Sequence, residues 1–460
     1  MRKKNKRLLS ALLGVCLATT MCVTSMSTWY EKPTAYGESV STSRIDTSSK
    51  ILEKVNGQYD DTEMVTSKFN DSVTVKDEEE SEVQGTISVI VDLGGDGLYD
   101  IYDGNEKFSD FVTTFAANNY ASELKKEQNK FMSALNRSGI DYEVKHYYNT
   151  VLNGVGLRID ASDYKKLSSI NGVKGVYRSE FYYEPTVEQL SNYTPVYSTG
   201  VYDSSNIDYK GEGTVVAVLD TGLDAYHAAF QTIPPESTLA WDKEYVAERM
   251  SQLDSYALGY SVNDVYYSDK VPYAFDYADD DADVFPGYSS HGVHVAGIIA
   301  GKDDSKVVDA AGNTFIGVAP NAQLAIMKVF SNNFDKKGFG GADTLDILRA
   351  LEDCTKLGVD VINMSLGSTG GFSDFESDER VTRVYENIEN AGISLVVAAG
   401  NEYSSGFGGG NGTNLATNPD SGTVGSPGSY NTSFTVASIE GQKSPYILGN
   451  EFPFPERKFR

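Results

Sequence analysis

Two of the four histidines of this chain lie in the segment SSHGVHVAGIIAG, residues 289–301. Two imidazoles at the start of a helix suit either a metal site or a catalytic base with a packing neighbour. A zinc site of the H-E-x-x-H type needs a glutamate between its histidines, and this chain has Gly292 and Val293 there. The favoured interpretation is a general base at His291 with His294 as its structural neighbour. The alternative is a zinc hydrolase that uses both histidines.

Two other segments carry side chains that suit acyl transfer. Asp220 ends the apolar run GTVVAVLD, and Asn401 follows the apolar run ISLVVAAG. A carboxylate can orient an imidazole and stabilise its cation, the imidazole can take a proton from a nucleophile, and an amide can donate to an oxyanion. Each segment alone is equally well explained as a turn, because Asp, Asn and Gly favour turns. Together, in the order Asp, His, Asn, they favour a hydrolytic site.

A parallel sheet would bring these side chains together. Strands that are apolar throughout and are separated by helices predict a doubly wound parallel α/β sheet. Functional groups gather beyond the carboxyl ends of the strands in such a sheet, where Asp220 and Asn401 stand. The predicted strands are GTVVAVLD, QLAIMKVF, DVINMSLGS, ISLVVAAGN and SFTVASIE, and the predicted helices include GADTLDILRALEDCTKLG and DERVTRVYENIENAG.

A smaller domain is predicted upstream, over residues 86–185. Its segments are TISVIVDL (strand), NNYASELKKEQNKFMSALNRSG (helix), DYEVKHYY and GVGLRI (strands), ASDYKKLSSI (helix) and GVKGVYRS (strand). Gly139 is the expected C-cap of the first helix. The order β-α-β-β-α-β predicts a ferredoxin-like α+β domain. His146, in its second strand, is interpreted as a surface residue.

Composition and the N-terminal residues limit the function classes. The formal charge of −26 argues against nucleic acid and anionic membranes as partners. A basic start followed by the apolar run 8–23 predicts a signal peptide within residues 1–37, with a membrane anchor as the alternative. Residues 38–85, acidic and rich in Ser and Thr, predict an exposed linker. Cys354 is the one cysteine outside the signal and is interpreted as a buried apolar residue.

The motifs together resemble those of the subtilisin-like serine peptidases, the subtilases. The matching segments are VVAVLDTGLD, SSHGVHVAGIIAG, GVAPNAQLAIMKVF, INMSLGS, SLVVAAGNE and NPDSGTVGSP. The resemblance implies a serine endopeptidase that acts on polypeptides, in which Asp220 orients the general base His291 and Asn401 stabilises the oxyanion. It also implies structural positions for His294, beneath the base, and for His227.

The resemblance also suggests substrate-binding and inhibitory segments. Ser365, Leu366 and Gly367 match the segment that pairs with extended peptide, although tight packing of small residues would explain them as well. Residues 86–185 resemble the family's propeptide, an intramolecular chaperone and inhibitor, and residues 190–460 resemble its catalytic domain. A monomer that needs no cofactor is expected.

The segment PYAFDYADDDADVFPG is similar to the cell-envelope proteinases of Gram-positive bacteria, the lactocepin and C5a-peptidase group. This similarity implies a protein that is secreted or associated with the cell envelope. Within the segment, the alternating Asp279, Asp281 and Asp283 could bind a structural calcium ion. Val284 replaces the glycine that an EF-hand loop requires, so a solvated acidic loop is the preferred interpretation.

The chain departs from the family pattern in one important respect. The family's nucleophile lies in a Gly-Thr-Ser-Met-Ala type segment, and none follows Asn401. Envelope proteinases often carry an inserted protease-associated domain before this serine, so the chain is expected to end before its nucleophile. The alternative function is an inactive product that at most binds peptide.

Overall fold

The computed structural model describes residues 85–182, 209–303, 315–333, 341–368, 375–400 and 424–437. The predicted signal peptide and acidic linker lie outside the described residues, and so does Asn401. No helix in the described ranges is both long and apolar enough to span a membrane.

Six parallel strands form the larger sheet, in the order β12-β11-β10-β6-β8-β7. The strands are β6 (Val215–Asp220), β7 (Tyr273–Asp276), β8 (Gln323–Lys328), β10 (Val361–Met364), β11 (Ser394–Ala398) and β12 (Phe434–Val436). This sheet confirms the predicted doubly wound α/β architecture. The edge strand β7 is not among the predicted strands.

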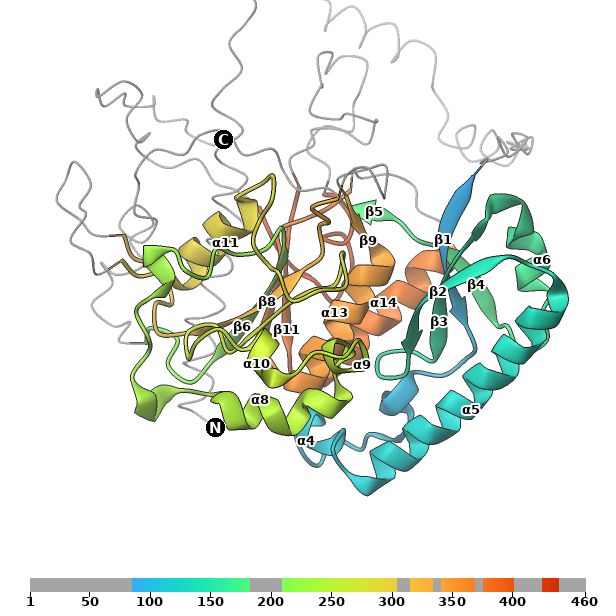
Figure 1. Cartoon of the computed structure of the whole chain (residues 1–460), viewed down its shortest axis with the longest axis horizontal. Helices are drawn as coiled ribbons and strands as arrows, with labels where there is room; N and C mark the ends of the chain where they lie inside the picture. The colour runs from blue at the N-terminus through green and yellow to red at the C-terminus, as the bar shows by residue number, and fades with distance from the viewer. Residues whose placement is uncertain are drawn as a thin grey trace, which may run out of the picture. The chain divides into compact units, whose positions relative to one another are not determined.

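Helices cover both faces of this sheet, as Figure 1 shows. The covering helices are α11 (His291–Ala300), α13 (Thr344–Leu357) and α14 (Phe375–Asn390). Alternate residues of β6 serve the two faces, because successive side chains of a strand point to opposite sides. Val216 and Val218 belong to the core that contains α11, whereas Val215 and Ala217 belong to the core of α13 and α14.

Shorter helices connect the strands of the larger domain. They are η3 (Ala228–Phe230), η4 (Glu236–Thr238), α8 (Lys243–Arg249), η5 (Met250–Gln252), α9 (Asp254–Ala257) and α10 (Val262–Val265), where η marks a 3₁₀ turn. All six lie between β6 and β7 in the sequence.

The smaller domain has an antiparallel sheet in the order β2-β3-β1-β4. Its strands are β1 (Thr86–Asp92), β2 (Tyr142–Tyr148), β3 (Gly154–Asp160) and β4 (Gly175–Arg178), and its helices are η1 (Gly97–Ile101), α4 (Phe108–Phe111), α5 (Phe115–Ser138), η2 (Ala161–Asp163) and α6 (Tyr164–Ser168). Thr114 caps the start of α5, and Gly139 ends it with a φ of 71°. The order of the principal elements is the predicted β-α-β-β-α-β.

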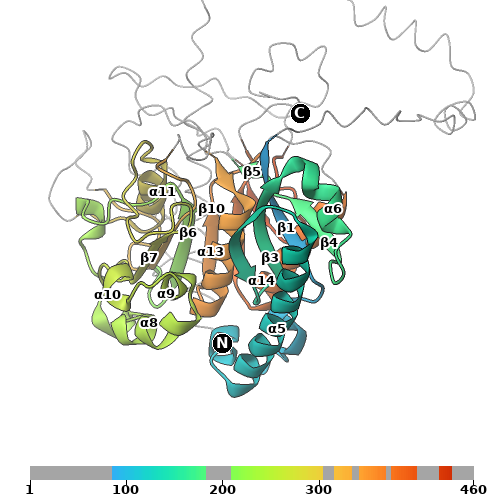
Figure 2. The same ribbon diagram turned by 45° about the vertical axis from the view of Figure 1, so that its right-hand side comes forward.

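The two domains meet through α13 and α14, which lie between the two sheets (Figures 1 and 2). Ile90 and Tyr148 of the small sheet belong to the same core as Leu345 of α13. A β-carbon at Gly156 would stand 3.2 Å from the Leu345 side chain, so glycine permits the close approach. Every residue of α13 is buried, including Cys354, as predicted for that cysteine.

A short antiparallel pairing adds to the contact between the domains. Strand β5 (Phe181–Tyr182), directly after the small domain, pairs with β9 (Ala342–Asp343), directly before α13. The Asp343 side chain accepts hydrogen bonds from Ser88 at 2.9 Å and from Ser179. The same side chain caps α13 by accepting from the Leu345 amide at 3.0 Å.

Candidate active site

Asp220 and His291 meet at the carboxyl edge of the larger sheet. Asp220 is the last residue of β6, and His291 is the first residue of α11. The Nδ1 atom of His291 lies 2.7 Å from Oδ1 of Asp220, and both side chains are buried. A carboxylate at this position holds the proton on Nδ1 and leaves the basic lone pair on Nε2. The structure therefore brings together two of the predicted site residues in the geometry of an oriented general base.

Thr221 fixes the relative position of these two elements. Its amide donates to Oδ1 of Asp220 at 2.7 Å. Its hydroxyl accepts from the Gly292 amide at 2.9 Å and donates to the Ser289 carbonyl at 3.1 Å. The loop after β6 is thereby bonded to the beginning of α11. Sequence reasoning did not assign Thr221, although it directly follows Asp220.

The remaining predicted histidines have structural positions. His294 is half-buried on α11, and burial, with a smaller contribution from nearby His291, lowers its pKa to about 4. His294 is therefore neutral at neutral pH. Nδ1 of His227 accepts from the Ala229 amide at 3.2 Å and caps η3. Across the described ranges, no group of three or more His, Cys, Asp or Glu side chains is arranged to hold a metal ion.

A buried ion pair lies beside Asp220 at the same edge. Lys328 is opposite Asp220 in the β6–β8 register, and its ammonium group bonds to Asp276 at the end of β7. Burial raises the pKa of Asp276 to about 7, although Lys328 acts in the opposite direction. The pair joins the ends of β7 and β8 next to the strand that carries the candidate catalytic carboxylate.

The predicted solvated acidic loop is only partly solvated. Asp283 is exposed, whereas Asp279 and Asp281 are half-buried. Asp279 accepts from the Ser331 hydroxyl and, at 2.8 Å, from the Asn332 amide, because the loop after β7 packs on the loop after β8. The interpretation of Asp279 as solvated is therefore wrong, and the calcium site stays a prediction.

The predicted substrate-binding segment follows β10. Ser365 and Leu366 are buried, and the Ser365 hydroxyl accepts from Asn363 at 3.1 Å. Gly367 lies close to the loop that contains Ser426, since a β-carbon there would stand 3.2 Å from the Ser426 carbonyl oxygen. The contacts of the segment within the described residues are packing contacts, and its role in substrate binding stays a prediction.

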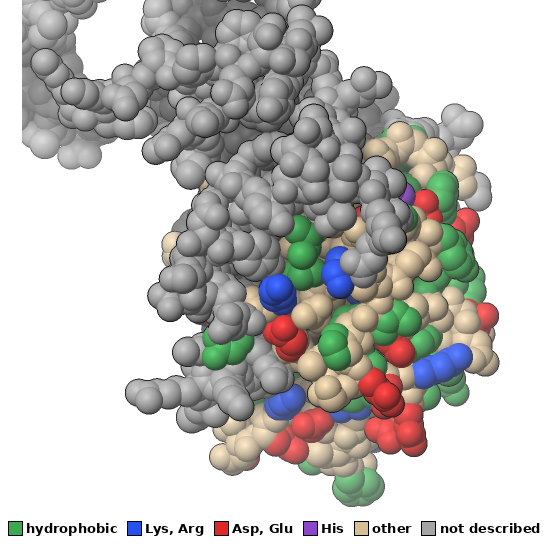
Figure 3. All heavy atoms as spheres, turned by 90° about the vertical axis from the view of Figure 1, so that its left-hand side faces the viewer, with side chains coloured by type: hydrophobic (Ala, Val, Ile, Leu, Met, Phe, Trp, Pro, Cys, Tyr) green, Lys and Arg blue, Asp and Glu red, His purple; other side chains and the backbone are tan. Residues whose placement is uncertain are grey.

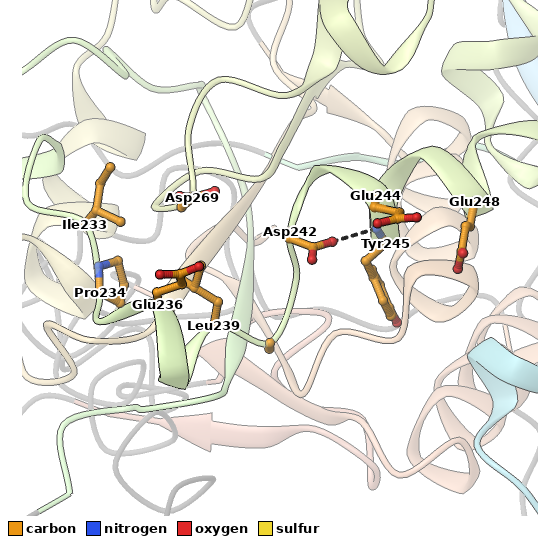
Figure 4. A pocket seen from close by; sticks show the side chains of 10 residues that line it. Ile233, Pro234, Glu236, Leu239, Asp242, Glu244, Tyr245, Glu248 and Asp269 are labelled. Atoms are coloured by element: carbon orange, nitrogen blue, oxygen red, sulfur yellow. Dashed lines mark hydrogen bonds between the residues drawn. The ribbon is translucent and has the colours of Figure 1, made fainter.

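A pocket of about 750 Å³ lies elsewhere on the larger domain, and none of the predicted site residues lines it (Figure 4). Its lining includes the carboxylates of Glu236, Asp242, Glu244, Glu248 and Asp269. Asp242 serves the local structure, because its side chain accepts from the Tyr245 amide at 2.8 Å and caps α8. Figure 3 shows acidic side chains scattered among basic and apolar ones on one face of the molecule.

Comparisons with known proteins agree with this geometry. The model of the Subtilase family matches residues 211–448, slightly more than half of the chain. The PII-type proteinase of Lacticaseibacillus paracasei is 36% identical over 305 residues, which cover 64% of this chain and 14% of that protein. The C5a peptidase of Streptococcus pyogenes is 33% identical over 236 residues, which cover 51% of this chain and 18% of that protein.

Among solved structures, fervidolysin from Fervidobacterium pennivorans, a keratinolytic enzyme related to subtilisin, gives a TM-score of 0.39 at 18% identity. That alignment covers 69% of this chain and 40% of fervidolysin. The chain spans less than a fifth of the length of the two proteinases above. The family match contains β6, α11 and the buried Asp220–His291 pair that they bring together, and the chain accordingly belongs to the subtilase family.

Proposed function

We propose that this chain carries the aspartate and the general base of a subtilisin-like serine endopeptidase, made as a secreted or cell-envelope-associated precursor. The observation that carries the proposal is the buried contact of 2.7 Å between His291 Nδ1 and Asp220 Oδ1. An imidazole held in this way is suited to take a proton from a nucleophile and to return it to the leaving amine.

Each residue has a definite role in the proposed reaction. His291 accepts the nucleophile's proton on Nε2, and Asp220 stabilises the imidazolium that forms. Asn401 donates its side-chain amide to the oxyanion of the tetrahedral intermediate. The nucleophile is a serine, and we propose that the complete polypeptide supplies it, because no Gly-Thr-Ser-Met-Ala segment stands in the printed sequence. Ser365, Leu366 and Gly367 hold an extended polypeptide substrate by strand-like pairing.

The small domain is proposed to act as an intramolecular inhibitor and chaperone. Its extensive contact with the catalytic domain supports this role. Oε1 of Glu352 accepts from three consecutive amides of the small domain, Asn149, Thr150 and Val151, at 2.6–3.2 Å. On α14, Arg380 and Arg383 pair with Asp96 of the small domain at 3.1 and 2.7 Å. These contacts cover α13 and α14 with the small domain's sheet.

The test is casein hydrolysis by the product of the complete reading frame. His291→Ala and Asp220→Asn should each lower kcat/KM by a factor on the order of 10⁴, because the base is lost or held in the wrong tautomer. His227→Ala is the matched control and should retain activity, since this histidine only caps a 3₁₀ turn. Full activity of the His291 variant would overturn the proposal.

An inactive peptide-binding product is the second candidate function. The absence of the family's serine segment from the printed sequence favours it. Residues 38–460 alone are expected to leave casein and their own junction after the small domain intact, because no acyl-enzyme can form without a nucleophile. If the complete reading frame also fails to cleave casein yet retains it in a binding assay, the inactive reading replaces the peptidase.

A further inference from the structure

His146 lies at the contact between the two domains, and the prediction that it is a surface residue is wrong. It belongs to β2, and its side chain is only 11% exposed. Nδ1 of His146 is 3.2 Å from Oδ1 of Asp254, and Nε2 is 3.6 Å from Oε2 of Glu352. One imidazole of the small domain therefore stands between two carboxylates of the catalytic domain.

The charged groups around His146 come from several elements. From α13 they are Asp346, Arg349, Glu352, Asp353 and Lys356, from α9 Asp254, from the loop after β7 Asp280, and from β2 itself Glu143 and Lys145. The catalytic domain thus contributes five carboxylates and two cations. The excess negative charge faces the small domain, which offers Lys145 and His146.

The two cations of the catalytic domain are already engaged. Arg349 contacts Asp254 at 2.6 Å, Asp280 at 2.7 Å and Asp346 at 3.1 Å. Lys356 is nearer to Asp353, at 3.2 Å, than to Glu352, at 3.6 Å. Further compensation for Asp254 and Glu352 must therefore come from the side of the small domain.

Only a protonated imidazole can serve both carboxylates. A neutral histidine has one ring N–H, so it can donate to one of these groups and must present a lone pair to the other. Oε2 of Glu352 and Nε2 of His146 are both buried, and neither makes a hydrogen bond within the described residues. An imidazolium carries N–H groups on both sides, one toward Asp254 and one toward Glu352.

We infer that docking of the small domain on the catalytic domain takes up a proton at His146, whose imidazolium bridges Asp254 and Glu352. Acidic solution then holds the domains together, and a rise in pH loosens them. This inference builds on the proposed inhibitory role of the small domain, whose release would be favoured as the pH rises. The electrostatics agree, because burial alone would lower the pKa of His146, but attraction to Asp254 and its hydrogen bonds to Asp254 and Glu352 raise it.

The sign of the effect follows from linkage. Because the pKa of docked His146 lies above its ordinary value of about 6.5, the docked state binds the proton more tightly than the undocked state. The stabilisation is complete below the ordinary pKa and disappears as the pH rises through the raised value. Each unit of the shift corresponds to about a tenfold change in the docking equilibrium.

Amide hydrogen exchange of residues 38–460 tests the inference. The amides of Asn149, Thr150 and Val151 donate to Glu352, so their protection reports docking. After correction for the intrinsic exchange rate, this protection should fall by about tenfold for each pKa unit of the shift between about pH 6 and about pH 9. Protection of the β6 amides, in the core of the catalytic domain, should not follow this dependence.

Two variants and a direct titration complete the design. His146→Gln keeps a donor but cannot be protonated, so its amide protection should be weaker at acidic pH and lose the pH dependence. His227→Gln, the control, should behave as the unmodified chain. An NMR titration of His146 in the unmodified chain does not depend on folding of the variant and should give a pKa above the ordinary value.

Protection that is independent of pH, or titration of His146 at or below its ordinary pKa, would overturn the inference. Neither readout uses peptide hydrolysis, so a complete polypeptide without peptidase activity would refute only the proposed function. Conversely, an active peptidase whose small domain docks equally well at every pH would refute only the role of His146.

Discussion

Gly292 and Gly222 approach each other so closely that a β-carbon on Gly292 would stand 2.4 Å from the Gly222 carbonyl oxygen. The first turn of α11 therefore rests directly on the loop that follows β6. This contact explains why the candidate base is followed by glycine, since a larger residue would separate His291 from Asp220.

Gly292→Ala should disturb the site more than its chemistry suggests. The added methyl group meets backbone atoms that cannot rotate away, and overpacking of this kind costs about 1–3 kcal/mol. We expect lower stability against urea and loss of the downfield NMR resonance of the His291 Nδ1 proton. Gly297→Ala in the same helix is the control, because its nearest neighbour is the Phe315 ring at 3.3 Å. An unchanged resonance in the Gly292 variant would contradict the prediction.

Tyr148→Phe should weaken the contact between the domains. The Tyr148 hydroxyl is buried and donates to the Leu345 carbonyl at 2.9 Å, and loss of one such hydrogen bond costs about 1 kcal/mol. Tyr147→Phe, one residue earlier on an exposed position of β2, should change the free energy of unfolding by less than about 0.5 kcal/mol. Urea unfolding of both variants makes the comparison, and equal effects would argue against the interdomain bond.

Lys270 should make stability rise with pH in the alkaline range. It is fully buried, its ammonium group donates to the Pro320 and Ala322 carbonyls, and burial lowers its pKa to about 7. Between about pH 7 and about pH 10.4 the unfolded chain binds this proton more tightly than the folded one, so the cost of burying the charge disappears as the pH rises.

Lys270→Met removes the titrating group and should flatten this part of the profile. The exposed Lys125→Met is the control and should leave the slope unchanged. Unfolding free energies measured across this pH range provide the test, and parallel profiles for the unmodified chain and the Lys270 variant would refute the assignment.

Asn401→Ala, made in the complete reading frame, should lower kcat by a factor on the order of 10²–10³ with little change in KM. This is the magnitude expected when one oxyanion-hole donor is removed, because the donor acts mainly in the transition state. Steady-state hydrolysis of a peptide substrate measures both constants. Unchanged turnover would remove Asn401 from the proposed oxyanion role.

Local sequence patterns were sufficient for most of the architecture. The apolar runs that became β6, β8, β10 and β11 have a buried residue at nearly every position, which is the pattern of a parallel sheet covered on both faces. Glycines with positive φ, such as Gly358 at 76°, end helices where predicted. Strand β7 was missed because its apolar run is only four residues long.

Long-range contacts were not predictable in the same way. The sequence around His146 reads as a half-exposed strand, and nothing local indicates that Asp254 and Glu352 will enclose it. Asp220 and His291 were predicted as partners through the family's motifs, not through their spacing. Asp279 was misread because the residues that bind it, Ser331 and Asn332, follow a different strand.

Helix α13 is enclosed by protein on all sides, yet the two sides differ in chemistry. One side contributes Leu348 and Leu351 to the catalytic domain's core, and the helix also carries Arg349, Glu352 and Lys356 among the ion pairs near the small domain. Charged groups regain their hydration when uncovered, whereas an apolar surface of similar size would promote aggregation. A catalytic domain that had lost its companion would therefore present ionic groups to water along this helix, which favours a soluble product after separation.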